Sequence, residues 1–154
     1  FLVSLIVLGC RAQPEEVRED NAHISRERGV VYYDGEPYNG KLVDTYPDGA
    51  VQQEFSLQEG IRSGISRFYW PDGTLKKEAE YKNGVYNGYV KVYYENGAIY
   101  SWFNYVDGHE SGRQQVWKSD GRLKANYEVI NGRKYGLTGV KNCINVLEED
   151  GHIF

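Results

Sequence analysis

The sequence repeats itself every 24 residues, and glycine marks the repeat. The first glycine column contains Gly40, Gly64, Gly88, Gly112 and Gly136. The second column contains Gly49, Gly73, Gly97 and Gly121, each preceded by Asp or Asn. Two positions after this second glycine stands an aliphatic residue, which is Val51, Leu75, Ile99 or Leu123. A fixed period of this length is typical of repeat proteins, in which each copy is one supersecondary unit that packs against its neighbours.

Each repeat contains the signal of a β-hairpin. The stretches "YWPDGTL" (69–75) and "YYENGAI" (93–99) place Asp-Gly or Asn-Gly between two runs of strand-forming residues. This is the strongest short-range hairpin signal, because glycine adopts the positive φ of a tight turn without steric penalty. A Gly-x-x-x-Gly segment such as 84–88 separates successive hairpins and is expected to be a longer connection. All the glycines of the two columns are therefore predicted to occupy turns.

The predicted fold is all-β, an elongated single antiparallel sheet built from consecutive 24-residue hairpins over residues 32–137. The composition agrees, since 14% of the residues are aromatic and 18 are glycine, which suit strands and turns respectively. Residues 138–154 break the period and are expected to be a C-terminal capping tail, because an open array needs caps. Residues 11–31 are poor in large apolar side chains and are expected to be a flexible or weakly helical polar tether. This segment is also a candidate cap for the first edge.

The first ten residues, "FLVSLIVLGC", form an apolar run. They are too short to span a bilayer, which needs about 20 apolar residues. We interpret residues 1–10 as a truncated signal peptide, because Val7-Leu8-Gly9-Cys10 resembles the lipobox of bacterial lipoproteins. The resemblance implies that Cys10 is lipidated and anchors the protein in the bacterial cell envelope, at the outer membrane or the periplasmic face. The alternative is a buried strand that ends in a free cysteine.

The repeat itself resembles a known family. "KNGVYNGYVKVYYENG" (82–97) resembles the MORN repeat, and more closely the bacterial variant found in YwqK-type antitoxin-family proteins. The resemblance extends over residues 33 to 137. The MORN core has a further glycine two residues after the second, and this chain has Leu42, Ser66, Val90 or Gln114 there. The lipid-headgroup binding attributed to some MORN proteins is therefore not carried over to this chain.

The sequence offers little for catalysis or metal binding. None of the three histidines, His23, His109 and His152, belongs to a metal-ligand spacing such as H-E-x-x-H. "GHESG" (108–112) places His, Glu and Ser together, but it occupies the connection between hairpins and is expected to be a solvated turn. Cys143 is expected to be a small buried hydrophobe. The alternatives for it are an intermolecular disulfide or a soft-metal ligand together with His152.

Aromatic side chains give the best functional signal. Tyr69, Tyr93 and Trp117 are spaced by 24 residues, and strand alternation predicts that further aromatic residues share their side of the sheet. We name the whole set, Tyr69, Tyr89, Tyr93, Tyr100, Trp102 and Trp117, the aromatic face. The opposite side is predicted to hold the core, with Phe68, Leu75, Val92, Ile99, Phe103, Val116 and Leu123. Tyrosine and tryptophan concentrate binding energy, which predicts a partner-binding surface. A ladder of aromatic pairs that only stiffens the sheet is the alternative.

These patterns predict a non-catalytic envelope lipoprotein that presents its repeat sheet to a protein partner. Two other functions stay open. The family resemblance implies an antitoxin-like neutralising protein, and exposed aromatic columns could serve as a carbohydrate-binding surface. A net charge of −4 without any basic run argues against nucleic acid as a partner. The lipid anchor is the only membrane contact that we expect, and we expect no cofactor and no metal.

Overall fold

The computed structural model describes residues 12–139. The strands are β1 (Glu16–Arg18), β2 (Ile24–Glu27), β3 (Val30–Tyr33), β4 (Glu36–Pro37), β5 (Gly40–Thr45), β6 (Val51–Gln58), β7 (Ile61–Tyr69), β8 (Leu75–Lys82), β9 (Val85–Tyr93), β10 (Ile99–Val106), β11 (His109–Glu110), β12 (Gly112–Trp117), β13 (Leu123–Ile130) and β14 (Arg133–Leu137). Cys10, Cys143 and all but the first two residues of the expected capping tail lie outside the described part. No helix within residues 12–139 has the length and apolar character needed to cross a membrane.

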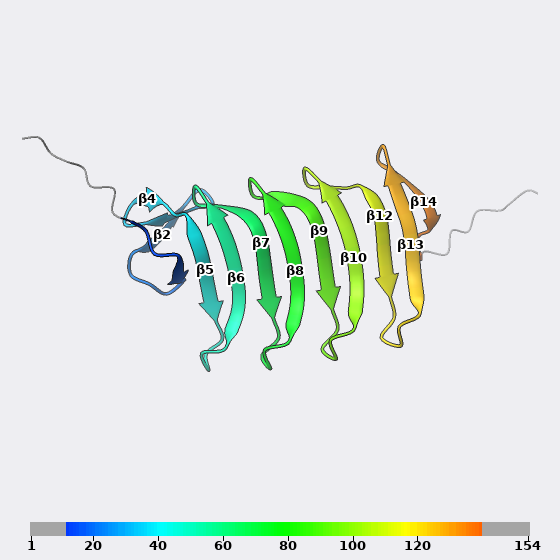
Figure 1. Ribbon diagram of the computed structural model, residues 1–154, viewed down its shortest axis with the longest axis horizontal. Helices are drawn as coiled ribbons and strands as arrows, with labels where there is room; N and C mark the ends of the chain where they lie inside the picture. Colours follow the sequence, from blue (N-terminus) through cyan, green and yellow to red (C-terminus); the bar gives the residue numbers. More distant parts are fainter. Residues whose placement is uncertain (1–11, 140–154) are drawn as a thin grey trace, which may run out of the picture.

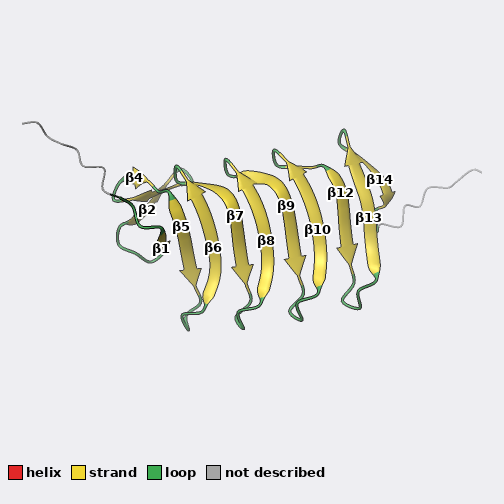
Figure 2. Cartoon of the chain, viewed as in Figure 1, coloured by secondary structure: helices red, strands yellow, loops and turns green. Residues whose placement is uncertain are grey.

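Eleven strands form one long sheet, shown in Figures 1 and 2. Its order is β1-β5-β6-β7-β8-β9-β10-β12-β13-β14, and β11 pairs with β10 beside this path. From β5 onward the paired strands are antiparallel, whereas β1 pairs with β5 in parallel. The prediction of an all-β, elongated array of hairpins is confirmed. The parallel edge strand makes the sheet mixed rather than purely antiparallel.

A second sheet of three strands, β2-β3-β4, lies at the first end of the array. The described part of the segment predicted to be a tether, residues 12–31, instead contains β1, β2 and the start of β3, so that expectation is wrong there. The segment has few apolar residues, but two of them are buried in the core and hold it against the main sheet. Val17 and Val31 are only 5% and 2% exposed, and they pack in one cluster with Leu42 and Phe55. A parallel edge strand and a small covering sheet thus close this end.

The second glycine column lies in three-residue loops that join the strands of each hairpin. Between β5 and β6, Gly49 N–H donates to the carbonyl of Tyr46 at 2.9 Å, and Tyr46 N–H donates to the carbonyl of Ala50 at 2.8 Å. The Asp48 carboxylate accepts the Ala50 N–H at 3.0 Å. The φ angles of Gly49, Gly73, Gly97 and Gly121 are 89°, 83°, 79° and 81°. A type I turn followed by a left-handed glycine is a common hairpin loop, and these four glycines occupy it.

The connection between hairpins is shorter than predicted. Asn83 and Gly84 join β8 to β9 with φ angles of 50° and 82°, the two left-handed residues of a type I′ turn. The pairs 59–60, 107–108 and 131–132 have positive φ at both residues as well. The chain therefore reverses at once, and the next glycine of each Gly-x-x-x-Gly segment belongs to a strand. The prediction that Gly40, Gly64, Gly88, Gly112 and Gly136 occupy turns is wrong.

Gly88 shapes a bulge in β9 instead. Ala79 pairs with Val90, and Tyr81 pairs with Tyr86. The two pairs are therefore two residues apart on β8 but four residues apart on β9, so β9 holds two extra residues between them. Gly88 has a φ of 119° there, which residues with a side chain rarely adopt. β7 makes the same irregularity against β6 around Gly64, whose φ is 92°. These glycines thus deform strands rather than reverse the chain.

Another bulge, beside each three-residue loop, changes which side chains share the aromatic face. Tyr69 pairs with Leu75 although the preceding pair is Phe68 with Lys77, so β8 holds one extra residue. The same shift in the next two hairpins gives the pairs Tyr93–Ile99 and Trp117–Leu123. Directly paired residues of antiparallel strands point to the same side of a sheet. The three aliphatic partners therefore lie on the aromatic face, and their expected place in the core is wrong.

The opposite side of the main sheet, which we name the core face, holds most of its buried residues. They are Leu42, Phe55, Leu57, Ser66, Ala79, Tyr81, Val90, Ser101, Gln114, Ala125, Tyr127 and Val129. Phe68, Val92, Phe103 and Val116 also point to this side, as predicted. Val31 and Tyr33 of the second sheet pack on its first cluster, which spans β5, β6 and β7. The aromatic face is thus the side opposite the second sheet.

Candidate functional site

A row of paired residues crosses the aromatic face at mid-strand. The pairs Arg67–Glu78, Glu78–Lys91, Lys91–Trp102 and Trp102–Gln115 run from β7 to β12. Four of the predicted residues, Tyr69, Tyr89, Tyr93 and Trp117, lie two positions from a member of this row on its own strand. Because side chains alternate along a strand, these four point to the same side as Trp102. The structure therefore brings together five of the six residues, and Tyr100 is the exception.

Lys91 connects the rings at the centre of this face. Its Nζ lies 4.2 Å from the ring centroid of Trp102 and 4.8 Å from that of Tyr89. An ammonium group held over an aromatic ring is attracted by the negative face of the ring. Within residues 12–139, no direct ring–ring contact joins the five aromatic residues to one another. Lys91 is thus the link between two of them, and Trp102 still remains 39% exposed.

Glu78 holds the neighbouring side chains in fixed positions. Its carboxylate accepts a hydrogen bond from Arg67 Nε at 2.8 Å and another from the Tyr89 hydroxyl at 2.8 Å. Burial and the Glu78 carboxylate raise the pKa of Tyr89 to about 12, which favours the protonated hydroxyl that donates to Glu78. A side chain that is ordered before binding loses less entropy when a partner arrives. The centre of the aromatic face is therefore pre-organised.

Three aromatic–aliphatic pairs extend the face towards the three-residue loops. They are Tyr69–Leu75, Tyr93–Ile99 and Trp117–Leu123, and they repeat in successive hairpins. Leu123 is 43% exposed, and the other five residues are half-buried. The sequence analysis missed the aliphatic partners because strict alternation does not anticipate a bulge. Their column two positions after the loop glycine was the signal that could have identified them.

Tyr100 has a different role from the other five. It is the extra residue of the bulge in β10, since Ile99 pairs with Tyr93 and Ser101 pairs with Val92. Its ring meets the ring of Tyr94 edge-on at 5.3 Å, and 38% of its surface is exposed. We therefore assign Tyr100 to the contact within its own hairpin, and not to the row that contains Trp102.

A second aromatic row, on the core face, was not singled out from the sequence. The rings of Tyr81 and Tyr86 are 4.8 Å apart, and those of Tyr86 and Tyr105 are 5.1 Å apart. Lys77 Nζ donates to the Tyr86 hydroxyl at 2.5 Å. Burial would raise the pKa of Tyr86, but the hydrogen bonds from Lys77 and Tyr81 outweigh burial and lower it. The 24-residue spacing of Tyr81 and Tyr105 was the signal for this row.

The residues considered for catalysis form no assembled site. His109 and Glu110 make up the short strand β11, where His109 Nδ1 lies 2.9 Å from the Asp107 carbonyl oxygen. Glu110 is engaged in an ion pair with Lys134 at 2.8 Å. Between residues 12 and 139, no three His, Cys, Asp or Glu side chains are grouped in a way that could hold a metal ion.

The comparison with protein families identifies one of the repeats. Residues 62–83 match the MORN repeat variant. The match extends from β7 through β8 into the type I′ turn that follows. No curated protein and no solved structure matches the chain. The matched hairpin is one unit of a longer array, and the match suggests a repeat-based binding module.

Proposed function

We propose that the protein is non-catalytic and binds a protein partner through its aromatic face. The observation that supports this most is the gathering of five aromatic residues from four strands, β7, β9, β10 and β12, on one side of the sheet. This is the side opposite the second sheet, and Trp102 is 39% exposed on it. Tryptophan, tyrosine and arginine dominate the energetics of protein interfaces, and this side of the sheet carries all three.

The experiment separates binding from folding. Trp102→Ala and Trp117→Ala are expected to fold nearly normally but to lose captured protein in pull-downs from bacterial envelope extract. Tyr135→Ala truncates a 52% exposed ring on β14, at the far edge of the same side of the sheet and two strands beyond β12. It is the control for position on that side and should retain binding, because Tyr135 is not one of the five gathered aromatic residues. Phe103→Ala should destabilise the fold, because Phe103 pairs with buried Val90 on the core face. The proposal fails if Trp102→Ala destabilises as much as Phe103→Ala, or if it captures the same proteins as the wild type.

We also propose that Cys10 carries a lipid that anchors the protein in the bacterial envelope. The apolar run that ends in Val7-Leu8-Gly9-Cys10 supports this proposal. Full-length protein expressed in a bacterium should partition into detergent and take up labelled palmitate. Cys10→Ser should abolish both, because the serine hydroxyl does not replace the thiol in the acylation reaction. Labelling that persists in the Cys10→Ser variant would show that the lipid is attached elsewhere or not through this motif.

Two alternative functions have supporting features and separate tests. The resemblance of the repeat to YwqK-type antitoxin proteins suggests a neutralising role, which requires that deleting the gene makes a neighbouring toxin gene intolerable to the cell. The exposed Trp102 ring beside Lys91 suggests stacking on a sugar, which requires a saturable quenching of tryptophan fluorescence by oligosaccharides. Intolerance of the toxin gene would support the neutralising role, and saturable quenching would support sugar binding. Binding of a protein partner alone predicts neither result.

A further inference from the structure

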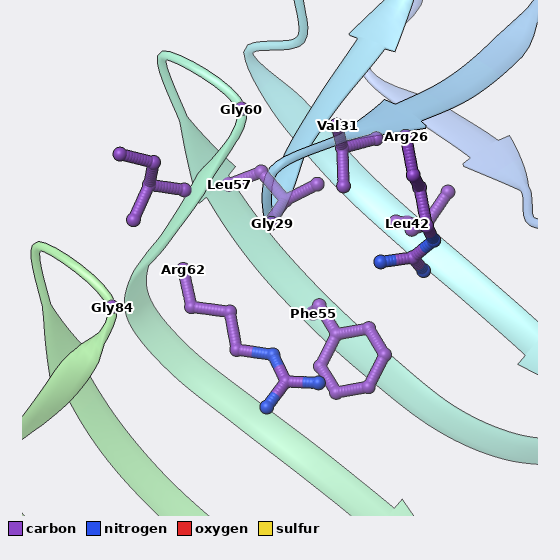
Figure 3. A pocket seen from close by; sticks show the side chains of 10 residues that line it. Arg26, Gly29, Val31, Leu42, Phe55, Leu57, Gly60, Arg62 and Gly84 are labelled. Atoms are coloured by element: carbon purple, nitrogen blue, oxygen red, sulfur yellow. The ribbon is translucent and has the colours of Figure 1, made fainter.

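A cavity of about 220 Å³ lies where the second sheet meets the core face, and Figure 3 shows it from close by. Val31 of β3 and Leu42, Phe55 and Leu57 of the main sheet form its apolar wall. The two sheets touch tightly beside it, where Val31 N–H donates to the Gly60 carbonyl at 2.9 Å. None of the residues of the aromatic face lines this cavity. It is therefore a site separate from the aromatic face.

Arg62 of β7 lines the cavity without an ion-pair partner among residues 12–139. Its guanidinium carbon lies 3.9 Å from the ring centroid of Phe55 and 5.6 Å from that of Tyr81. Figure 3 shows the guanidinium group beside the Phe55 ring. The side chain is half-buried, so the charge has lost part of its hydration without gaining a carboxylate. Stacking on Phe55 and a hydrogen bond to the Tyr81 hydroxyl position the group, and a guanidinium has further N–H donors with which to bind an anion.

A second guanidinium group reaches the same cavity from the other sheet. Arg26 of β2 lines it, and its Nη2 is paired with Glu19 Oε1 at 2.5 Å. Figure 3 shows the Arg26 side chain extending from the second sheet towards the region of Leu42 and Phe55. The cavity thus combines an apolar wall with two cations, and within the described part of the chain only Arg26 has a carboxylate partner. Its natural complement is a carboxylate attached to a small apolar group.

We propose that this cavity captures the C-terminal residue of a peptide, with its free carboxylate on Arg62 and its apolar side chain against Val31, Leu42, Phe55 and Leu57. Arginine binds carboxylates through two parallel hydrogen bonds, which also fixes the orientation of the ligand. The volume is below the roughly 300–1,000 Å³ of ordinary ligand pockets, which suits one residue better than a cofactor. Gly29 borders the cavity, and a Cβ built there would meet nothing within 4 Å, so the space beside this residue is open.

The test uses two fluorescently labelled pentapeptides of sequence Gly-Ser-Gly-Ser-Leu, one with a free C-terminal carboxylate and one amidated. Anisotropy titration of the full-length protein should show saturable binding of the free acid and at least about tenfold weaker binding of the amide. Arg62→Gln should weaken binding of the free acid to the level of the amide. Arg67→Gln is the matched control on the opposite face and should bind like the wild type. Trp102→Ala should also bind the peptide normally, so this result is separable from the test of the aromatic face.

Thermal unfolding followed by circular dichroism accompanies each titration. If Arg62→Gln does not fold, Arg62→Lys replaces it, because lysine keeps the positive charge but cannot form two parallel hydrogen bonds to a carboxylate, so binding of the free acid should still weaken. Equal affinity for the acid and the amide would overturn the proposal. The absence of saturable binding at millimolar peptide, or wild-type affinity in a folded Arg62→Gln variant, would overturn it as well.

Discussion

At the scale of single residues, the glycines meet two different physical requirements. Gly97 has a φ of 79°, and a Cβ built on it would meet no atom within 4 Å, so only its backbone conformation demands glycine. Gly60 also has a positive φ, of 72°, but there a Cβ would collide with the carbonyl oxygen of Val31. The first glycine allows a hairpin loop, and the second also allows the close approach of the covering sheet. The recurring glycines of this chain therefore do not share one structural cause.

Gly97 gives a prediction that isolates backbone strain. Gly97→Val should lower the free energy of unfolding by about 1–3 kcal/mol, because a β-branched residue is strained at positive φ. Gly97→Asn should cost clearly less, since asparagine tolerates the left-handed region. Urea denaturation of both variants measures the difference. Equal stability of the valine variant and the wild type would mean that the loop does not hold this conformation in solution.

At the scale of the hairpin, tyrosine hydroxyls connect neighbouring repeats. The Tyr46 hydroxyl donates to the Tyr69 carbonyl at 2.9 Å, from one hairpin to the next. The Tyr94 hydroxyl donates to the Trp117 carbonyl at 2.9 Å in the same way. Trp70 occupies the equivalent position between them, and its buried Nε1 has no hydrogen-bond partner in the part of the chain that the structure describes. The hydroxyl contact thus recurs in every second repeat.

Removal of one hydroxyl tests this connection. Tyr94→Phe should lower the free energy of unfolding by about 0.5–1.5 kcal/mol, the usual contribution of one hydrogen bond. Tyr100→Phe is the matched control, because its ring contacts the same Tyr94 ring while its hydroxyl bonds to no described residue. Chemical denaturation should therefore show a loss for Tyr94→Phe and almost none for Tyr100→Phe. Equal losses would assign the effect to ring packing instead.

The hairpins were predictable from sequence because each is specified locally. The Asn-Gly and Asp-Gly pairs mark both kinds of turn, and alternation correctly places Tyr89, Tyr93 and Trp102 on one side. Alternation fails at Leu75. The bulge adds one residue to β8 next to the loop, so Leu75 points to the side opposite the one that strict alternation predicts. A bulge depends on how two strands pair, and a single strand does not reveal it. The predicted face therefore holds five of its six aromatic residues, all but Tyr100, and it lacked the aliphatic partners.

Contacts between distant segments were beyond the reach of the same analysis. The second sheet lies before the first repeat, where no 24-residue period exists to signal strands. The packing of this sheet on the core face brings Arg26 to the same cavity that Arg62 lines, although the two residues are far apart in the chain. Their proximity depends on tertiary packing alone. The cavity therefore had no local signature in the sequence.

At the scale of the whole molecule, the main sheet behaves as a one-dimensional array. From β5 onward, the strands pair with neighbours in chain order, and the covering sheet packs only at the first end. The stability of such an array is approximately a sum of the contributions of single repeats and of the interfaces between neighbours. One complete period should therefore be removable without loss of the fold, as long as the alternation of side chains is preserved.

Deletion of residues 91–114 tests this modularity, because it removes one period of 24 residues. The deletion joins Val90 to Gln115, which occupies the position of Lys91 one repeat later. Val116 then takes the place of Val92 on the core face, and Trp117 takes the place of Tyr93 on the aromatic face. The shortened protein should retain a β-sheet circular dichroism spectrum and cooperative thermal unfolding. Its melting temperature should be lower, since one repeat and one interface are lost.

Deletion of residues 91–113 is the matched control and removes one residue fewer. It joins Val90 directly to Gln114, so two residues that both belong to the core face become neighbours. Because the side-chain period of a strand is two, every later side chain of that strand then points to the wrong side. This variant should lose cooperative unfolding although it keeps more of the chain. If the two deletions unfold alike, the repeats are not independent units, and the sheet is stabilised by contacts that extend beyond neighbouring hairpins.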